Sequence, residues 1–289
     1  MKKTVAAIAA ALTAAGAMAA AAVLADPATA AAPTAPTVHP VAVTTPLPPI
    51  TYSYGQSGPT ATVYKRTAAL ATVTPTAITF DGTTGKLKLS VMANANFSFT
   101  AGQFLWEDPD GGDHTAEHAG HTLKFTKNTT RTVTLSFDGV GAGDVIWSPD
   151  EAGVAASWVF STSGAPITAG PASTESPLGY AQKKTTVTVY RAGHVLATVT
   201  PKSVTYNRTK GTLTLSVTAK AKFSVKNNQF IWEDPSGGDH AADNPGKTFH
   251  LKKNTTRTIS ISFQDVGKGD IIWAPTEELV TGIWTVPAK

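Results

Sequence analysis

The segment Trp-Glu-Asp-Pro-Asp-Gly-Gly-Asp-His occupies residues 106–114, and it returns with one substitution, Ser236, as residues 232–240. The offset of 126 residues between the copies holds without a gap over about a hundred residues. It pairs Tyr54 with Tyr180, Asp144 with Asp270 and Trp158 with Trp284. Roughly half of the paired positions are identical, so the chain contains a tandem duplication.

Within each repeat the hydrophobic pattern has a period of two. Leu87, Leu89 and Val91 alternate with polar residues, and Leu213 and Leu215 repeat the pattern 126 residues later. Such alternation predicts strands with one face on a core and the other in water. No stretch of ten residues keeps a helical period. We therefore predict an all-β chain of two tandem antiparallel β-sandwich domains of immunoglobulin-like type, at 58–160 and 180–289.

The N-terminal region has the composition of an export signal followed by a linker. Lys2 and Lys3 precede an Ala-rich apolar run, and Val23-Leu24-Ala25 before Asp26 offers a small-residue cleavage site. This pattern predicts a signal peptide at 1–25. Residues 26–57 are rich in Pro, Ala and Thr and predict an extended linker, and a Ser/Gly/Pro linker follows at 161–179. We expect a secreted, extracellular bacterial protein with no membrane span once processed.

Cysteine and charge limit the chemistry and the partners. The chain has no cysteine, which excludes thiolate metal sites, thiol catalysis and disulfides. Residues 54–160 carry 7 Lys and Arg against 10 Asp and Glu, whereas residues 180–289 carry 15 against 8. Neutral surface drift is the favoured explanation of this difference; the alternatives are self-association of the oppositely charged repeats, or attachment of the basic repeat to an anionic surface. No basic groove is interleaved with aromatic residues, so we expect no nucleic-acid partner.

The duplicated segment concentrates carboxylates in a short loop. Pro109 and Gly111-Gly112 predict a turn there. Carboxylates that crowd together repel one another unless a cation or hydrogen-bond donors offset their charge, and calcium binds six to eight oxygens in flexible loops. The favoured interpretation is a turn whose aspartates accept hydrogen bonds from backbone amides; the alternative is a calcium site. The candidate ligands are Glu107, Asp108, Asp110, Asp113, Glu233, Asp234 and Asp239.

The histidines after this loop match the H-x-x-E-H pattern of one class of zinc peptidase, with His114 and His118 as its ends. That pattern needs a helix to place both histidines on one face, and the surrounding sequence predicts strands. The second repeat has Asn244 in place of the second histidine. A surface loop is therefore expected, with metal binding by His114, His118 and His121 as a minor alternative.

Each repeat has three tryptophans at matched positions. Trp106 and Trp147 belong to strongly apolar segments, which predicts a core role, because tryptophan is highly buried on average. Trp158 and Trp284 lie near the ends of the repeats. Those two are the better candidates for exposure, and in the alternative of a sugar-binding surface they are the predicted ligand-binding residues.

The sequence best fits a secreted, non-catalytic protein that serves in a surface layer, matrix or adhesion, because repeated modules multiply contacts without new chemistry. An extracellular carbohydrate-binding module, using tryptophan and the acidic loop to hold a cell-surface glycan, is the first alternative. A secreted hydrolase or metal-dependent enzyme built on the acidic loop is the second. No set of side chains can be singled out as catalytic, and calcium is the one cofactor predicted.

Overall fold

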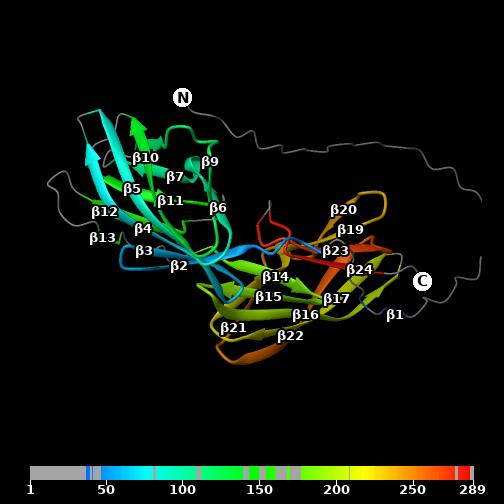
Figure 1. Ribbon diagram of the computed structural model, residues 1–289. Helices are drawn as coiled ribbons and strands as arrows, with labels where there is room; N and C mark the ends of the chain where they lie inside the picture. Colours follow the sequence, from blue (N-terminus) through cyan, green and yellow to red (C-terminus); the bar gives the residue numbers. More distant parts are fainter. Residues whose placement is uncertain are drawn as a thin grey trace, which may run out of the picture. The chain divides into compact units, whose positions relative to one another are not determined.

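The chain folds into antiparallel β-sheets, as the period-two pattern predicts (Figure 1). The computed structural model describes residues 37–39, 41, 47–80, 83–108, 112–138, 143–149, 154–160, 168–169, 177–207, 209–276 and 279–286. The predicted signal peptide and most of both linkers lie outside these residues. In the described part there is no α-helix, and no helix is long and apolar enough to cross a membrane.

The first repeat has two larger sheets and one strand pair. The first sheet, in the order β10-β5-β4-β3-β2, contains β10 (Thr129–Asp138), β5 (Thr84–Ala93), β4 (Ala68–Phe80), β3 (Thr60–Lys65) and β2 (Tyr52–Ser57). The second, in the order β13-β12-β11-β7-β8, contains β13 (Thr168–Ala169), β12 (Ala156–Phe160), β11 (Gly143–Trp147), β7 (Phe104–Glu107) and β8 (Asp113–Thr115). The strand pair is β6 (Phe97–Thr100) with β9 (Thr122–Phe125), and the 3₁₀ turn η1 (Ala101–Gln103) leads from β6 into β7.

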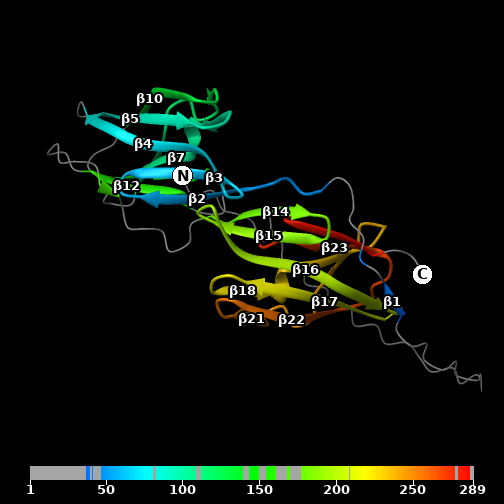
Figure 2. The same ribbon diagram turned by 60° about the horizontal axis from the view of Figure 1, so that its bottom comes forward.

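The second repeat reproduces these elements. Its first sheet contains β14 (Gly179–Lys183), β15 (Thr186–Arg191), β16 (His194–Tyr206), β17 (Lys210–Ala219) and β22 (Thr255–Gln264). Its second sheet contains β20 (Asp239–Ala241), β19 (Phe230–Glu233), β23 (Gly269–Trp273) and β24 (Gly282–Val286). The pair β18 (Phe223–Lys226) and β21 (Thr248–Leu251) and the turn η2 (Asn227–Gln229) complete it. One further strand, β1 (Thr37–His39), joins the first sheet of this repeat by pairing with β16 (Figure 2).

Each repeat has its own hydrophobic core, formed by residues from its sheets. Leu87, Leu89 and Val91 are fully buried, as the alternation predicts, and their counterparts in β17 are buried as well. Aromatic rings join the strands of the second sheet: Phe104 stacks on Trp147 with ring centroids 5.5 Å apart, and Phe230 stacks on Trp273 at 5.8 Å. Full burial of one large apolar side chain stabilises a fold by about 1.5–3 kcal/mol.

The stretch predicted as the first linker contributes strands. β2 begins at Tyr52 and pairs with β3 along its whole length, and Tyr54 is buried in the core of the first repeat. β1 and Val41 belong to the second repeat, because Val41 packs against its core. A proline-rich composition limits the length of a strand but leaves the residues between prolines free to pair at a sheet edge.

Two glycines at matched positions allow β11 and β23 to begin beside β7 and β19. A Cβ at Gly143 or Gly269 would overlap the carbonyl oxygen of Glu107 or Glu233, and Gly269 has φ +154°, which side chains rarely adopt. The glycine at this position is therefore required by the close approach of two backbones.

We expect Gly269→Ala to lower the stability of the second repeat by about 1–3 kcal/mol, because the added methyl group must displace the backbone of β19. The measurement is urea unfolding followed by tryptophan fluorescence, in which one transition should shift to lower urea. Gly267→Ala is the control, since a Cβ there meets nothing within 4 Å. Equal transition midpoints for the two variants would contradict this account.

Candidate functional site

The duplicated segment forms a β-hairpin in both repeats. In the second repeat β19 ends at Glu233, and β20 returns with His240 opposite Trp232 and Asp239 opposite Glu233. The backbone N–H of Asp234 donates to the carbonyl of Gly238 at 2.9 Å, which closes the loop, and the first repeat has the same bond from Asp108 to Gly112. The predicted turn at Gly-Gly is therefore confirmed as a hairpin loop for the residues that the structure describes; Asp110 lies outside them.

Asp234 organises the loop of the second repeat. Its Oδ1 accepts hydrogen bonds from the Ser236 N–H at 2.8 Å, the Ser236 hydroxyl at 2.6 Å and the Gly238 N–H at 3.0 Å. These bonds favour the charged carboxylate, with the Ser236 hydroxyl contributing most, and hold the pKa of Asp234 well below its ordinary range. The loop is thus an Asx-type turn, the arrangement expected where aspartate precedes a glycine-rich turn.

In each repeat a histidine contacts the aspartate at the start of the hairpin loop. Nε2 of His114 lies 2.7 Å from Oδ2 of Asp108, and Nε2 of His240 lies 3.4 Å from Oδ2 of Asp234. The two residues of each pair belong to opposite sides of the loop, so the contact joins the end of one strand to the start of the next. The first histidine of the H-x-x-E-H pattern therefore has a structural partner.

The other histidines of that pattern lie in a loop, as expected. Residues 116–121 follow β8 without forming a helix, His118 has φ +53°, and the His121 N–H donates to the His118 carbonyl. The two side chains are exposed. The helical geometry that a zinc peptidase site requires is absent from this described stretch.

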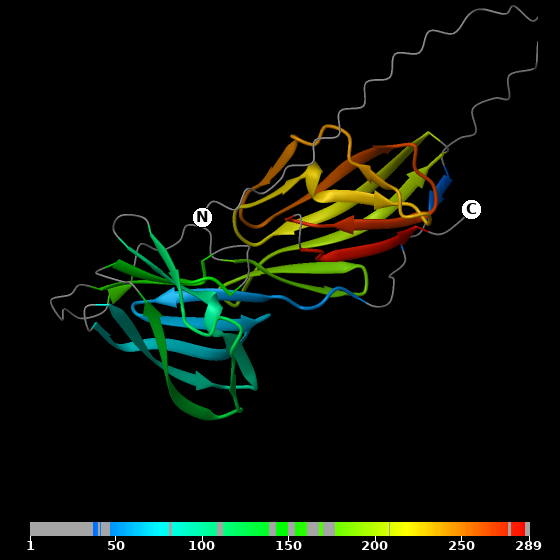
Figure 3. The ribbon, with the colours of Figure 1, turned by 90° about the horizontal axis from the view of Figure 1, so that it is seen from above.

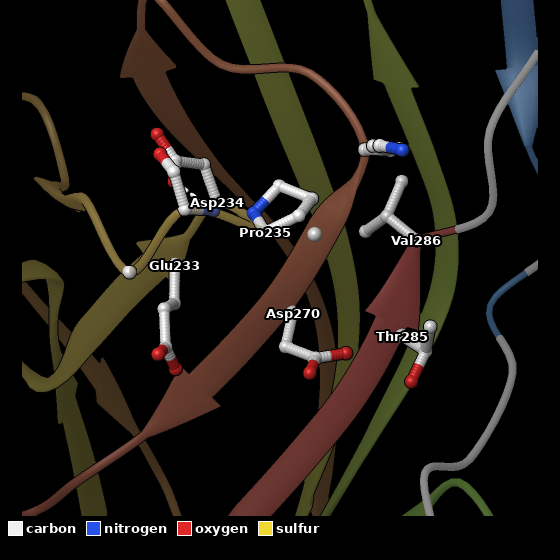
Figure 4. A pocket seen from close by; sticks show the side chains of 10 residues that line it. Glu233, Asp234, Pro235, Asp270, Thr285 and Val286 are labelled. Atoms are coloured by element: carbon white, nitrogen blue, oxygen red, sulfur yellow. Dashed lines mark hydrogen bonds between the residues drawn. The ribbon is translucent and has the colours of Figure 1, made fainter.

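A row of carboxylates crosses the second sheet of each repeat. Glu233 lies opposite Asp239 on one neighbouring strand and opposite Asp270 on the other. Glu233 and Asp270 also line a hollow of about 630 Å³, and their side chains are labelled in Figure 4. Asp113, Glu107 and Asp144 form the same row in the first repeat. Partial burial raises the pKa of Asp144. Asp144 and Asp270 were not among the predicted metal ligands, although their matched positions in the two repeats were a usable signal.

The carboxylates do not gather around a common point. Among the described residues no group of three or more His, Asp or Glu side chains could hold a metal ion. Asp234 is turned toward the donors of its own loop. The geometry thus favours the hydrogen-bonded turn over the calcium site, which stays a prediction.

The six tryptophans belong to the core. All have at most 1% of their surface exposed. The expected exposure of Trp158 and Trp284 is wrong: both lie on the inner face of an edge-proximal strand, and their indole N–H groups donate to the carbonyls of Pro59 at 2.6 Å and Thr185 at 2.8 Å. A strand near the end of a repeat can still turn one face to the core, even at the edge of its sheet, as β24 does. A fully buried indole presents no face to a sugar, so the structure offers no support for a sugar-binding role of these two residues.

Comparison with known proteins adds little. No family model matches the chain, and no curated protein matches it. The chain is similar to a solved structure described as the crystal structure of the conserved domain protein from Bacillus anthracis, with 12% identity and a TM-score of 0.22 over 79% of this chain and 84% of that one. A similarity of this size supports no inference about function.

We expect Asp234→Asn to weaken the acid sensitivity of the second repeat. The folded carboxyl has a lower pKa than its ordinary value of 3.8, so its loop bonds contribute fully above about pH 4 and are lost as the pH falls below 3.8 toward the folded pKa. Asparagine keeps a neutral acceptor and does not titrate. The melting temperature against pH should fall less steeply below pH 4 in this variant. Asp239→Asn, which removes no hydrogen bond described for this loop, should follow the wild-type curve; an unchanged slope in Asp234→Asn would refute the assignment.

The hydrogen-bonded turn also predicts the response to calcium. The wild-type chain should melt at the same temperature in millimolar calcium and in EDTA. A calcium-dependent rise on the order of 10 °C, lost in Asp113→Asn and Asp239→Asn, would instead establish the calcium site, because a ligand that binds only the folded state raises its melting temperature. Differential scanning calorimetry measures both.

Proposed function

We propose that the mature chain is a secreted, non-catalytic protein of two tandem β-sandwich domains that attaches to an anionic surface polymer through the second repeat. The observation that carries the proposal is a group of lysines at one end of that repeat with few counterparts in the first. Export follows from the signal-peptide pattern at 1–25. The immunoglobulin-like arrangement of the sheets is part of the proposal.

The duplicated residues support a structural role. Trp232 is fully buried against Phe263, Asp234 holds the hairpin loop, and His240 contacts Asp234. These side chains, which made the segment a candidate for catalysis or sugar binding, are occupied in packing and in local hydrogen bonds. Duplication has therefore preserved a folding unit, which favours a structural or adhesive protein over the hydrolase and the carbohydrate-binding module.

The lysine-rich end comprises Lys220, Lys222, Lys252 and Lys253. All four are exposed. Lys220 and Lys222 precede β18, and Lys252 and Lys253 follow β21; because Phe223 pairs with Leu251, the two groups meet at the same end of the β18–β21 pair. The matched positions of the first repeat, residues 94, 96, 126 and 127, contain a single lysine.

These lysines have no carboxylate partners in the described part of the chain. The two ion pairs found there are the His–Asp contacts of the hairpin loops. Farther along the same pair, the cationic groups of Lys247 and Arg257 lie 4.9 and 5.6 Å from the centroid of the Phe249 ring. Unpaired cations on one end of a domain produce a local positive potential that attracts polyanions at low ionic strength.

The predicted attraction between the acidic and basic repeats gains no support from these contacts, since no ion pair in the described residues joins one repeat to the other. It stays a prediction, and an anionic polymer is the partner that the concentrated charge fits better. No described aromatic platform accompanies the lysines, which is consistent with recognition of charge without readout of bases.

The test replaces lysines by the residues that the first repeat has at the same positions. The full chain with Lys220→Asn, Lys222→Asn and Lys252→Thr should elute from a heparin or teichoic-acid resin at clearly lower salt than wild type, because fewer counterions are released on binding. The fold should persist, since these residues occupy equivalent positions in the first repeat.

The control removes the same charge elsewhere in the second repeat, with Lys183→Ser, Lys202→Thr and Lys210→Thr, again taken from the first repeat. It should elute near wild type. If both variants elute equally early, the net charge governs binding and the lysine-rich end has no special role. If the wild-type chain is not retained at low salt, the proposed attachment is wrong.

A further inference from the structure

β1 pairs with the last three residues of β16. β15 pairs with β16 only as far as Val199, and β1 takes the next stretch, with Thr37, Val38 and His39 opposite Tyr206, Thr205 and Val204. A register shift at Pro201 separates the two stretches. Figures 2 and 3 both show β1 beside this end of the sheet. Val204 and Tyr206 are buried there.

The matching edge in the first repeat has no strand beside it among the residues that the structure describes. β3 pairs with β4 only as far as Val73, the register shifts at Pro75, and residues 77–80 pair with β5 on the other side. In the described part of the chain no strand pairs with the outer side of residues 77–80, which we term the open edge. Ile78, the counterpart of Val204, is only partly buried.

The hydrogen-bond pattern shows which groups of the open edge are available. The Asn207 N–H donates to the Lys210 carbonyl across the β16–β17 turn. Antiparallel pairs alternate between hydrogen-bonded and non-hydrogen-bonded, so Val204 and Tyr206 turn their backbone groups away from β17 and toward β1. The β4–β5 register is the same, so Ile78 and Phe80 direct their backbone N–H and C=O groups toward the open edge.

We propose that the open edge is a second acceptor for an extended strand, and that its occupant is the Thr37–His39 segment of another copy of this chain. The proposal is independent of the polymer attachment above. The segment fits because its pairing with the equivalent edge is present in the second repeat, and because Pro36 and Pro40 confine it to three residues, a length that residues 78–80 match.

Transfer of this strand between copies conserves the number of strand pairs. When the Thr37–His39 segment of one chain leaves its own β16 and pairs with β4 of another, one edge is emptied and one is filled. Protein concentration therefore decides which arrangement is populated, as in domain swapping. A crowded extracellular layer is the condition under which chains would join in this way.

The first experiment tests the acceptor with a peptide of residues 35–43 and NMR of the full chain. In wild type the peptide should shift the amide signals of Ile78 and Phe80. The variant Thr37→Pro/His39→Pro lacks the two N–H groups that face β16, so its own β1 should no longer pair there. In this variant the peptide should shift the amide signals of Val204 and Tyr206 as well as those of Ile78 and Phe80. A peptide N-methylated at Thr37 and His39 should be inactive, whereas N-methylation of Val38, whose N–H faces away, should be tolerated. Shifts confined to Val204 and Tyr206 would overturn the proposal.

The second experiment tests whether another copy is the occupant. Thr79 is the counterpart of Thr205, the partner of Val38. Because the chain has no cysteine, oxidising a mixture of Val38→Cys and Thr79→Cys chains should give a mixed disulfide dimer whose yield rises with concentration. Thr134→Cys, exposed on β10 at the opposite edge of the same sheet, replaces Thr79→Cys in the control. Equal yields in the two mixtures would exclude the second copy as occupant.

Discussion

The structure of each repeat depends on the packing of buried aromatic rings between its sheets. Phe104 on Trp147 and Phe230 on Trp273 are stacked with interplanar angles of 4° and 3°, and Trp158 and Trp284 fix the last strand through their indole N–H groups. With no cysteine to crosslink the sheets, apolar burial and these buried hydrogen bonds must hold the strands together. The same packing buries every tryptophan, so no tryptophan ring is exposed to stack on a sugar.

The hairpin loop shows how a motif that resembles a reactive site can be structural. Acidic residues and a histidine close in sequence are the ingredients of a metal or acid–base site. Here Asp234 is satisfied by two backbone N–H groups and a hydroxyl, and the other carboxylates spread along a row across the strands. The charged carboxylate of Asp234 holds the loop that joins the end of β19 to the start of β20. This structural role explains why the loop is preserved in both repeats.

The repeats differ at exposed positions that contribute little to the hydrophobic core. Most of their core residues occupy matched positions, whereas the ends of the β18–β21 and β6–β9 pairs differ in lysine content and the edges of β16 and β4 differ in occupancy. Exposed ends and edges tolerate substitution because little is buried there. They are consequently the places where two copies of one fold can acquire different partners, a polyanion at one and an extended strand at the other.

The sequence by itself determined the duplication, the all-β class and most of the core, because alternation such as Leu87, Leu89 and Val91 reports directly which face of a strand is buried. It also predicted the turn in the duplicated segment. Only the tertiary structure decided that Trp158 and Trp284 are buried, since burial of a strand near the end of a repeat depends on the sheet neighbours that cover it. It alone brought Asp270 beside Glu233 and placed β1 on β16, because strand partners far apart in sequence leave no local pattern.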